Sequence, residues 1–222
     1  MRVLIIGAGG QAQVVADILL RMQERDGSPH PLGYLDDNPA LNGRSYIGLP
    51  VLGNLARLAE IDHDGVVIAL GDNALRKRVY EEARSRGERL IVARHPAAIV
   101  APDVLIGPGS MICAGVVVNT GTEIGANVIL NTSSSADHHN RIGDHVHIAP
   151  GAHLGGEVTL GEGVLVGIGA TVLPRVRVAD WARIGAGACV HKPVPAGLTV
   201  VGVPARPLKR KLSRNTRETH KP

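Results

Sequence analysis

The chain has 222 residues and a formal net charge of +4, with 44% hydrophobic residues, only 2% aromatic residues and no phenylalanine. This length allows one large domain or two small ones, and the core must be filled by aliphatic side chains. Residues 206–222 hold seven basic residues against one acid, so residues 1–205 carry a net negative charge, which argues against a basic nucleic-acid-binding face.

The N-terminus has the pattern of the first half of a Rossmann-like unit. Arg2–Ile6 is an aliphatic run of strand length, a turn with Gly9 and Gly10 follows, and an amphipathic helix is expected from Gln11 to about Arg25. Such a turn brings backbone N–H groups to a phosphate or sugar. The third glycine of the dinucleotide fingerprint is missing, so a packing turn without ligand stays open.

Further strands are expected at residues 32–35, 65–70 and 90–92, with a helix at about 74–86. The strand at 32–35 ends in Asp36 and Asp37, which suit ribose or sugar hydroxyls, although a helix cap or turn pair is the structural alternative. The strand at 65–70 enters the turn of Gly71 and Asn73. Because ligands bind where such strand ends converge, this edge could hold one nucleotide. We expect this domain to span residues 1–94.

The larger part of the chain is organised by a six-residue repeat. Every sixth residue from Val100 to Val190, sixteen positions without a slip, is isoleucine, leucine or valine except Ala136. Four residues after each lies a small or β-branched residue, apart from Asn140. A period of six predicts a parallel β-helix in which three hexapeptide sides close each coil. We expect about five coils within residues 95–205, and a function or an extruded loop at the break between residues 136 and 140.

Five of the ten histidines lie between residues 138 and 153. They allow a polar patch, a metal site, or a catalytic base, since neutral histidine accepts protons at cellular pH. We favour His138 as the base. Gly156 follows it by three hexapeptides and so lies one coil beyond it, where its N–H could serve as an oxyanion donor. The same spacing stacks Ile168 under Ala186 as an apolar track.

With these features in place, the sequence resembles bacterial sugar acetyltransferases of the left-handed β-helix class. It is similar to the UDP-4-amino-sugar N-acetyltransferases of bacillosamine synthesis, the GDP-perosamine N-acetyltransferases and the sialic acid O-acetyltransferase-like proteins. The stretches that carry the resemblance are residues 5–10, Tyr34-Leu35-Asp36-Asp37, residues 69–73, residues 130–134, Asp137-His138 and residues 201–205.

The resemblance implies a homotrimer with active sites between neighbouring β-helices, and acetyl-CoA as donor to a nucleotide-linked amino sugar. By position, His138 matches the general base. His147, Ile168 and Ala186 match acetyl-CoA contacts, and Gly9, Gly10, Gln11, Asp36 and Asp37 match nucleotide-sugar contacts. His139, which we also count among the catalytic candidates, stands where the family has an acid, and Gln11 stands where the bacillosamine enzymes have a histidine.

We therefore expect direct transfer of an acetyl group to a sugar 4-amino group, with UDP or GDP as the nucleotide and no metal. The rival hypotheses are a sugar O-acetyltransferase, a zinc β-helix hydratase and a non-catalytic trimeric binding protein. Cys113 and Cys189 show no metal or disulfide spacing and are expected to be reduced, in a cytoplasm. We expect no signal segment, no membrane insertion and no nucleic-acid partner, with a disordered basic tail at 206–222.

Overall fold

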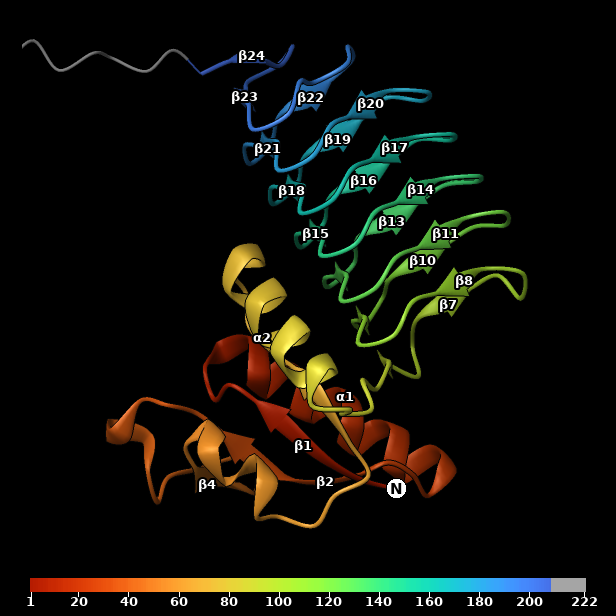
Figure 1. Cartoon of the computed structure of the whole chain (residues 1–222). Coiled ribbons are helices and arrows are strands. Elements are labelled where there is room, and N and C mark those ends of the chain that lie inside the picture. Colours follow the sequence, from red (N-terminus) through yellow and green to blue (C-terminus); the bar gives the residue numbers. More distant parts are fainter. Residues whose placement is uncertain (209–222) are drawn as a thin grey trace, which may run out of the picture.

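The structure, a computed structural model, describes residues 1–208. Figure 1 shows an α/β unit from which a long stack of short strands rises. The elements of the α/β unit are β1 (Arg2–Ile6), α1 (Gly10–Asp26), β2 (His30–Leu35), β3 (Ser45–Tyr46), β4 (Leu49–Gly53), β5 (Gly65–Ile68) and α2 (Asn73–Ser85), with 3₁₀ turns at Pro39–Leu41 and Leu55–Ala59.

The sheet of this unit has the order β3-β4-β2-β1-β5, and β1 runs parallel to both β2 and β5. Four consecutive aliphatic residues of β1 are buried, as expected for a parallel strand covered on both faces. Helix α1 ends at Gly27, whose φ of 73° is the left-handed conformation that glycine adopts easily. The predicted strands β1, β2 and β5 and both helices are present. Strand β3, at the edge of the sheet, and β4, between β3 and β2, were not predicted.

The rest of the chain is a triangular β-helix with three faces. The first face consists of β7 (Ile99–Val100), β10 (Val117–Val118), β13 (Ser135–Ala136), β16 (His153–Leu154), β19 (Thr171–Val172) and β22 (Cys189–Val190). The second face consists of β8 (Leu105–Ile106), β11 (Glu123–Ile124), β14 (Arg141–Ile142), β17 (Thr159–Leu160) and β20 (Arg177–Val178). The third face consists of β6 (Ala93–Arg94), β9 (Met111–Ile112), β12 (Ile129–Leu130), β15 (His147–Ile148), β18 (Leu165–Val166), β21 (Arg183–Ile184), β23 (Thr199–Val201) and β24 (Arg206–Pro207).

The predicted coil of three hexapeptides is confirmed by the strand register. Val117 pairs with Ser135, and Ser135 pairs with His153, so each strand pairs with the one that follows three hexapeptides later. From Ile112 to Val190 every position of the aliphatic series is buried, so these side chains fill the core. Stability of such a stack comes largely from contacts between neighbouring coils.

The break in the repeat does not extrude a loop, which corrects one of our two expectations for it. Ala136 lies in β13 and is buried, and Asn140 is fully buried in the interior column. Both residues keep the phase of the helix. The irregularity is therefore one of side-chain chemistry and leaves the path of the backbone unchanged.

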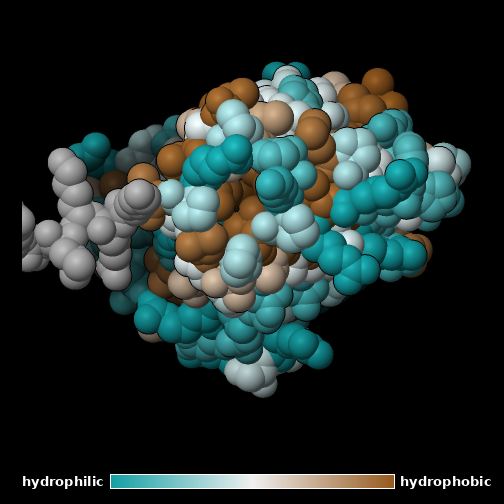
Figure 2. Space-filling view, turned by 90° about the horizontal axis from the view of Figure 1, so that it is seen from above, coloured by the Kyte–Doolittle hydropathy of each residue, from teal (hydrophilic) through white to brown (hydrophobic). Residues whose placement is uncertain are grey.

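The C-terminal end closes with a coil that is shorter than three hexapeptides. Within it Val178 pairs with Val194, and Arg183 pairs with Thr199. Viewed from this end, hydrophobic residues lie in the middle of the molecule and reach its upper edge, whereas hydrophilic residues dominate the right and lower sides (Figure 2). Arg206 and Pro207, which we assigned to the tail, form β24 and pair antiparallel with β23. The rest of the predicted tail, residues 209–222, lies outside the described residues.

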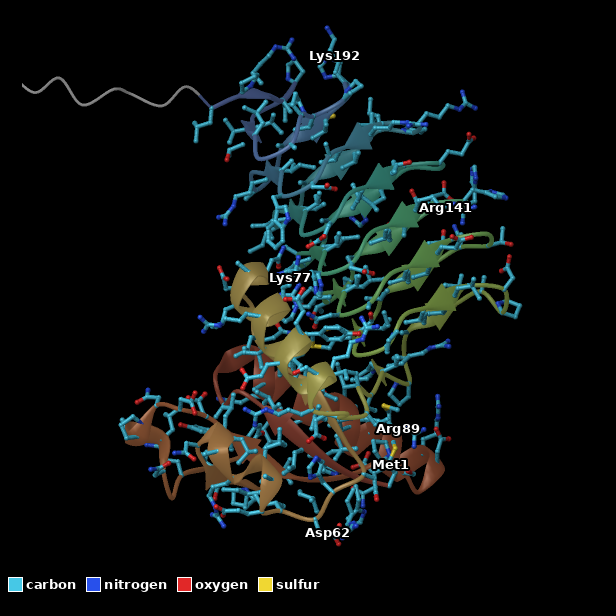
Figure 3. All side chains as sticks on the ribbon, in the orientation of Figure 1. Met1, Asp62, Lys77, Arg89, Arg141 and Lys192 are labelled. Atoms are coloured by element: carbon cyan, nitrogen blue, oxygen red, sulfur yellow. The ribbon has the colours of Figure 1, made fainter. Side chains whose placement is uncertain are left out.

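Helix α2 joins the two parts through one buried cation. The side chain of Arg76 is fully buried, and its guanidinium donates to the carbonyl oxygens of Asn127 (3.2 Å), His145 (2.8 Å) and Leu70 (3.1 Å). Burial lowers the pKa of Arg76 to about 10. Beside it, Lys77 lies between α2 and the β-helix (Figure 3), where it pairs with Glu162. These contacts hold the α/β unit against the corner between the second and third faces.

The chain enters the β-helix slightly earlier than predicted. Ala93–Arg94 already forms β6, which pairs with β9, so the last two residues assigned to the first domain belong to the third face. The strand expected at 90–92 is reduced to a single bridge between Leu90 and Val66.

Candidate active site

His138 and His139 lie at the corner between the first and second faces, in the turn from β13 to β14. Both residues are exposed. Their Nδ1 atoms are 3.1 Å apart, and the two rings meet edge to face with centroids 5.2 Å apart. The two histidines therefore form a hydrogen-bonded pair on the surface of the β-helix.

The turn that carries this pair is held by the residue that breaks the repeat. The side-chain amide of Asn140 donates to the carbonyl of Asp137, and its Oδ1 accepts from Val158 N–H in the next coil. The hydroxyl of Thr122, one coil earlier, donates to the same Asp137 carbonyl. Since these groups lie in the core, their hydrogen bonds fix the turn firmly. Asn140 thus holds the turn of His138 and His139 from inside the core.

Gly156 lies directly beneath the imidazole of His138. A Cβ at this glycine would fall 2.5 Å from Cε1 and 2.6 Å from Nε2 of His138, so a larger residue would collide with the ring. Gly156 is buried, and within residues 1–208 its N–H donates to no acceptor. Buried N–H groups without a partner are rare in proteins. The stacking predicted from the hexapeptide spacing is present, with a free donor next to the ring.

The carboxyl edge of the α/β sheet presents Gly9 and Gly10 in exposed positions at the start of α1. Gln11 is half-buried, and its Nε2 is buried without a hydrogen-bond partner among the described residues. A buried amide donor normally has a partner, so this one is free for a ligand. Gly10 also lines a cavity of about 430 Å³ between α1 and the β-helix.

Asp36 and Asp37 already have partners within the protein. The carboxylate of Asp36 accepts from the N–H groups of Ala8 and Asn38, and that of Asp37 accepts from Leu55 N–H. These contacts match the turn role that we kept as the structural alternative. Carboxylate oxygens accept more than one hydrogen bond, so the role in sugar binding stays a prediction.

Gly71 and Asn73 lie next to the third face of the β-helix. The side-chain nitrogen of Asn73 donates to the carbonyl oxygens of Gly163 (3.0 Å) and Val164 (3.3 Å), whereas its Oδ1 is buried without a partner among residues 1–208. Asn73 therefore ties the two parts together and keeps one free acceptor. Gly71 is exposed beside it.

His147 lies on the third face, where the edge of the sheet meets it. Burial, together with the smaller effect of the Arg76 charge, lowers its pKa to about 4, although the hydrogen bond with the Gly71 backbone opposes this shift. His147 is therefore neutral at cellular pH, and its Nε2 is 3.2 Å from the side-chain nitrogen of Asn131. A neutral imidazole here suits a polar contact without charge.

Ile168 and Ala186 are exposed at a different corner, between the third and first faces. Ile168 is 62% exposed, which is unusual for isoleucine and typical of a binding surface. Thr132 lies two coils earlier in the same column and lines the cavity that Gly10 lines. Thr132 and His95, a second lining residue, were missed as candidates, although the hexapeptide spacing pointed to Thr132.

The predicted residues thus form two groups in one protomer. The first group extends across the third face: Gly10, Ile168 and Ala186 lie around its corner with the first face, and His147 lies on the face itself. At the other side of this face, Asn73 contacts the turn between the second and third faces. His138, His139 and Gly156 lie at the corner between the first and second faces. Within residues 1–208 no cluster of three or more histidine, cysteine or acidic side chains is arranged to hold a metal ion. The same residues include no helix long and apolar enough to cross a membrane.

Comparison with known proteins decides the family. Residues 2–83 match the family model described as the PglD N-terminal domain. The chain is 34% identical to GDP-perosamine N-acetyltransferase of Escherichia coli O157:H7 over 93% of its length and 96% of that protein. The chain belongs to the family of nucleotide-sugar N-acetyltransferases.

Solved structures of family members have the same fold over nearly the whole chain. The acetyltransferase domain of PglB from Neisseria gonorrhoeae FA1090 is 36% identical, with a TM-score of 0.86 over 93% of this chain and 99% of that one. PerB from Caulobacter crescentus, in complex with CoA and GDP-perosamine, is 35% identical, with a TM-score of 0.87 over 94% and 98%. The β-helix is thus of the left-handed class, and the predicted fold and family are confirmed.

Proposed function

We propose that this protein transfers an acetyl group from acetyl-CoA to the 4-amino group of a nucleotide-linked amino-deoxy sugar. The observation that carries the proposal is the contact between the exposed His138 imidazole and Gly156, whose buried N–H is unpaired among residues 1–208. A base and an oxyanion donor at one spot are what acyl transfer to an amine needs. The family membership supports the same reaction.

The proposed reaction is a direct transfer. The neutral amine attacks the thioester carbonyl carbon while Nε2 of His138 takes the amine proton, and a C–N bond forms. The Gly156 N–H donates to the oxyanion of the tetrahedral intermediate. The C–S bond then breaks, and the leaving thiolate takes the proton from His138. No acyl-enzyme is needed, and Cys113 is unsuited to form one because burial raises its pKa to about 12.

The nucleotide sugar is assigned to the carboxyl edge of the α/β sheet. The free amide nitrogen of Gln11 and the free Oδ1 of Asn73 supply one donor and one acceptor there. The exposed turn of Gly9 and Gly10 at the N-terminus of α1 suits a phosphate. Asp36 and Asp37 are assigned to sugar or ribose hydroxyls. GDP-perosamine is the first substrate to test, because relatives are named for it.

Acetyl-CoA is assigned to the corner between the third and first faces, against His147, Ile168 and Ala186. His138 lies at the other corner of the first face, so one protomer does not present both groups to one thioester. A threefold arrangement with the first faces inward places the His138 corner of one copy beside the acetyl-CoA corner of the next. We therefore propose a homotrimer with shared active sites.

The outward side chains of the two faces support this arrangement. The first face presents Ile99, Val117, Ser135, His153, Thr171 and Cys189, none of which is a lysine, an arginine or an acid. The second face presents Leu105, Glu123, Arg141, Thr159 and Arg177, of which Glu123, Arg141 and Arg177 are charged. Since interfaces are depleted in charge, the first face suits contact between copies and the second face suits solvent.

The test of the function uses purified protein with acetyl-CoA and release of free thiol as the readout. Acceptors are GDP- and UDP-linked 4-amino sugars and their 4-hydroxy counterparts. We expect turnover with an amino sugar and a loss of about 10²–10⁴-fold in kcat for His138→Ala, the range for a general base. His30→Ala, an exposed histidine of the α/β unit, is the control. Turnover of hydroxy sugars alone would make the protein an O-acetyltransferase and refute the proposal.

The test of the trimer uses two matched threonines. Thr171 on the first face and Thr159 on the second are both half-buried. Thr171→Arg is expected to lower the mass in analytical ultracentrifugation and to abolish turnover, whereas Thr159→Arg keeps both. A Thr171→Arg protein of unchanged mass would show that the first face is not the interface.

A further inference from the structure

We propose that His139 is a positioning residue for the general base. Its Nδ1 accepts a hydrogen bond from Nδ1–H of His138, which leaves Nε2 of His138 without a proton and ready to accept one. This inference rests on the proposed role of His138.

The argument starts from the two ring nitrogens. The Nδ1 atoms of His138 and His139 are 3.1 Å apart, within hydrogen-bond distance. A neutral imidazole carries one N–H and one bare nitrogen, so a bond between two Nδ1 atoms requires a proton on one of them only. If His138 bears it, His138 has its bare nitrogen at Nε2, the atom that faces Gly156 at 2.6 Å from the position of a Cβ there.

The nearby carboxylates do not supply the hydrogen bond. Oδ1 of Asp137 accepts from the side-chain amide of Asn119 and from the His138 backbone N–H, both at 2.9 Å. The first of these bonds is the main reason that the pKa of Asp137 is lowered. Asp103 accepts from Gly121 N–H at 2.8 Å. Within residues 1–208 no carboxylate is hydrogen-bonded to either ring. Along this corner, the charged groups within two coils of the pair are Asp103, Asp137, Glu157 and Arg175, of which Arg175 pairs with Glu157.

The ring of His139 is held in place by the coil before it. A Cβ on Gly121 would lie 2.6 Å from Cδ2 of His139, so glycine at this position makes room for the imidazole. His139 itself has φ of 57°, in the left-handed region that is uncommon for residues other than glycine. Glu157 and Arg175, one and two coils further on, have φ of 61° and 64° in the same turn. The left-handed turn therefore recurs in successive coils whatever the side chain, so the backbone conformation at position 139 does not depend on the histidine.

A neutral acceptor has a consequence that an acid would not have. It orients the base but contributes no permanent negative charge to stabilise the protonated imidazole of His138. A carboxylate in its place would orient the base and also favour its protonated form. The two side chains are therefore distinguishable by the pH dependence of the reaction.

The experiment measures kcat, both KM values and the pH profile of kcat/KM for the wild type, His139→Ala and His139→Glu. His139→Ala is expected to lower kcat about 10–100-fold, as loss of an orienting partner does, with little change in KM. His139→Glu is expected to regain kcat at alkaline pH and to move the acidic limb of the profile to higher pH than in the wild type. The control is Arg175→Ala, which introduces an alanine at the equivalent left-handed position two coils further on. We expect this variant to behave as the wild type.

Two results would overturn the inference: a His139→Ala enzyme with wild-type kcat, or a His139→Glu enzyme whose acidic limb coincides with that of the wild type. Parallel measurement of His138→Ala separates the two proposals. An active His138→Ala enzyme removes the proposed base and with it this inference. An inactive one, beside a His139→Ala enzyme of wild-type kcat, removes only the positioning role.

Discussion

Replacement of Gly156 by alanine tests the site most directly. The φ of Gly156 does not lie in the left-handed region, so an alanine fits the backbone without strain. Its Cβ would lie 2.5 Å from Cε1 of His138, whereas carbon atoms in contact are about 3.5–4.0 Å apart. The imidazole of His138 is exposed and must therefore move outward by about 1 Å.

A displacement of this size has a known cost in catalysis. Misplacement of a reacting group by about 1 Å lowers the rate on the order of 10²-fold. The Gly156→Ala protein keeps its backbone N–H, so the proposed oxyanion donor remains and the loss reports on the position of His138. We expect kcat, measured by thiol release, to fall about 100-fold, with little change in KM for acetyl-CoA.

The control is Gly143→Ala, which crowds the stack at another corner. Its Cβ would lie 2.9 Å from the carbonyl carbon of Gly161, a backbone atom that cannot swing away. We expect this variant to lower Tm while kcat per folded enzyme stays at the wild-type value. A Gly156→Ala enzyme with unchanged kcat would refute the reasoning, because the position of the imidazole would then be irrelevant to turnover.

Three further predictions concern stability and donor binding. Arg76→Met leaves buried carbonyls unpaired and should lower the free energy of unfolding by about 3 kcal/mol or more in denaturant titrations, whereas the exposed Arg78→Met should change it little. Burial lowers the pKa of His63, but its hydrogen bonds to the Ile61 carbonyl and to Glu88 outweigh burial and the net pKa is raised. The stabilisation is therefore complete below the ordinary histidine pKa and is lost as pH rises through the raised value, so Glu88→Gln should lower Tm more at pH 5.5 than at pH 8.5. Ile168→Asp, at a site that is 62% exposed, should raise KM for acetyl-CoA and leave Tm unchanged; an unchanged KM would remove this corner from the donor site.

The β-helix could be predicted in detail because one packing rule is repeated many times. Each aliphatic residue from Ile112 to Val190 meets the same interior, so the six-residue period specifies the register without a long-range search. The α/β unit has no such redundancy. Strand β3 has only two residues, and β4 contains Pro50 within it. The two strands form a hairpin that joins the sheet through the pairing of β4 with β2.

The site could be predicted in part for the same reason. Counting three hexapeptides per coil is enough to place His138 over Gly156 and to align Ile168 with Ala186. The hydrogen bond between His138 and His139 was not foreseen, because it depends on a turn whose left-handed residue is a histidine. For Asp36 and Asp37 the sequence left a turn role and a sugar-binding role open, since a carboxylate that closes a turn and one that binds a ligand look alike in sequence.

Asn140 shows how a residue beneath a candidate site can interrupt a repeat. A buried amide in an apolar column is costly unless its donors and acceptor are paired. Here its nitrogen bonds the Asp137 carbonyl and its oxygen bonds the Val158 N–H, so the cost is offset and the turn is fixed from within. An aliphatic residue at position 140 would pack as well as its neighbours but would leave the turn of His138 with one support fewer. The polar group in the core therefore holds the turn that carries the exposed His138 imidazole, and the irregularity of the sequence lies beneath the proposed base.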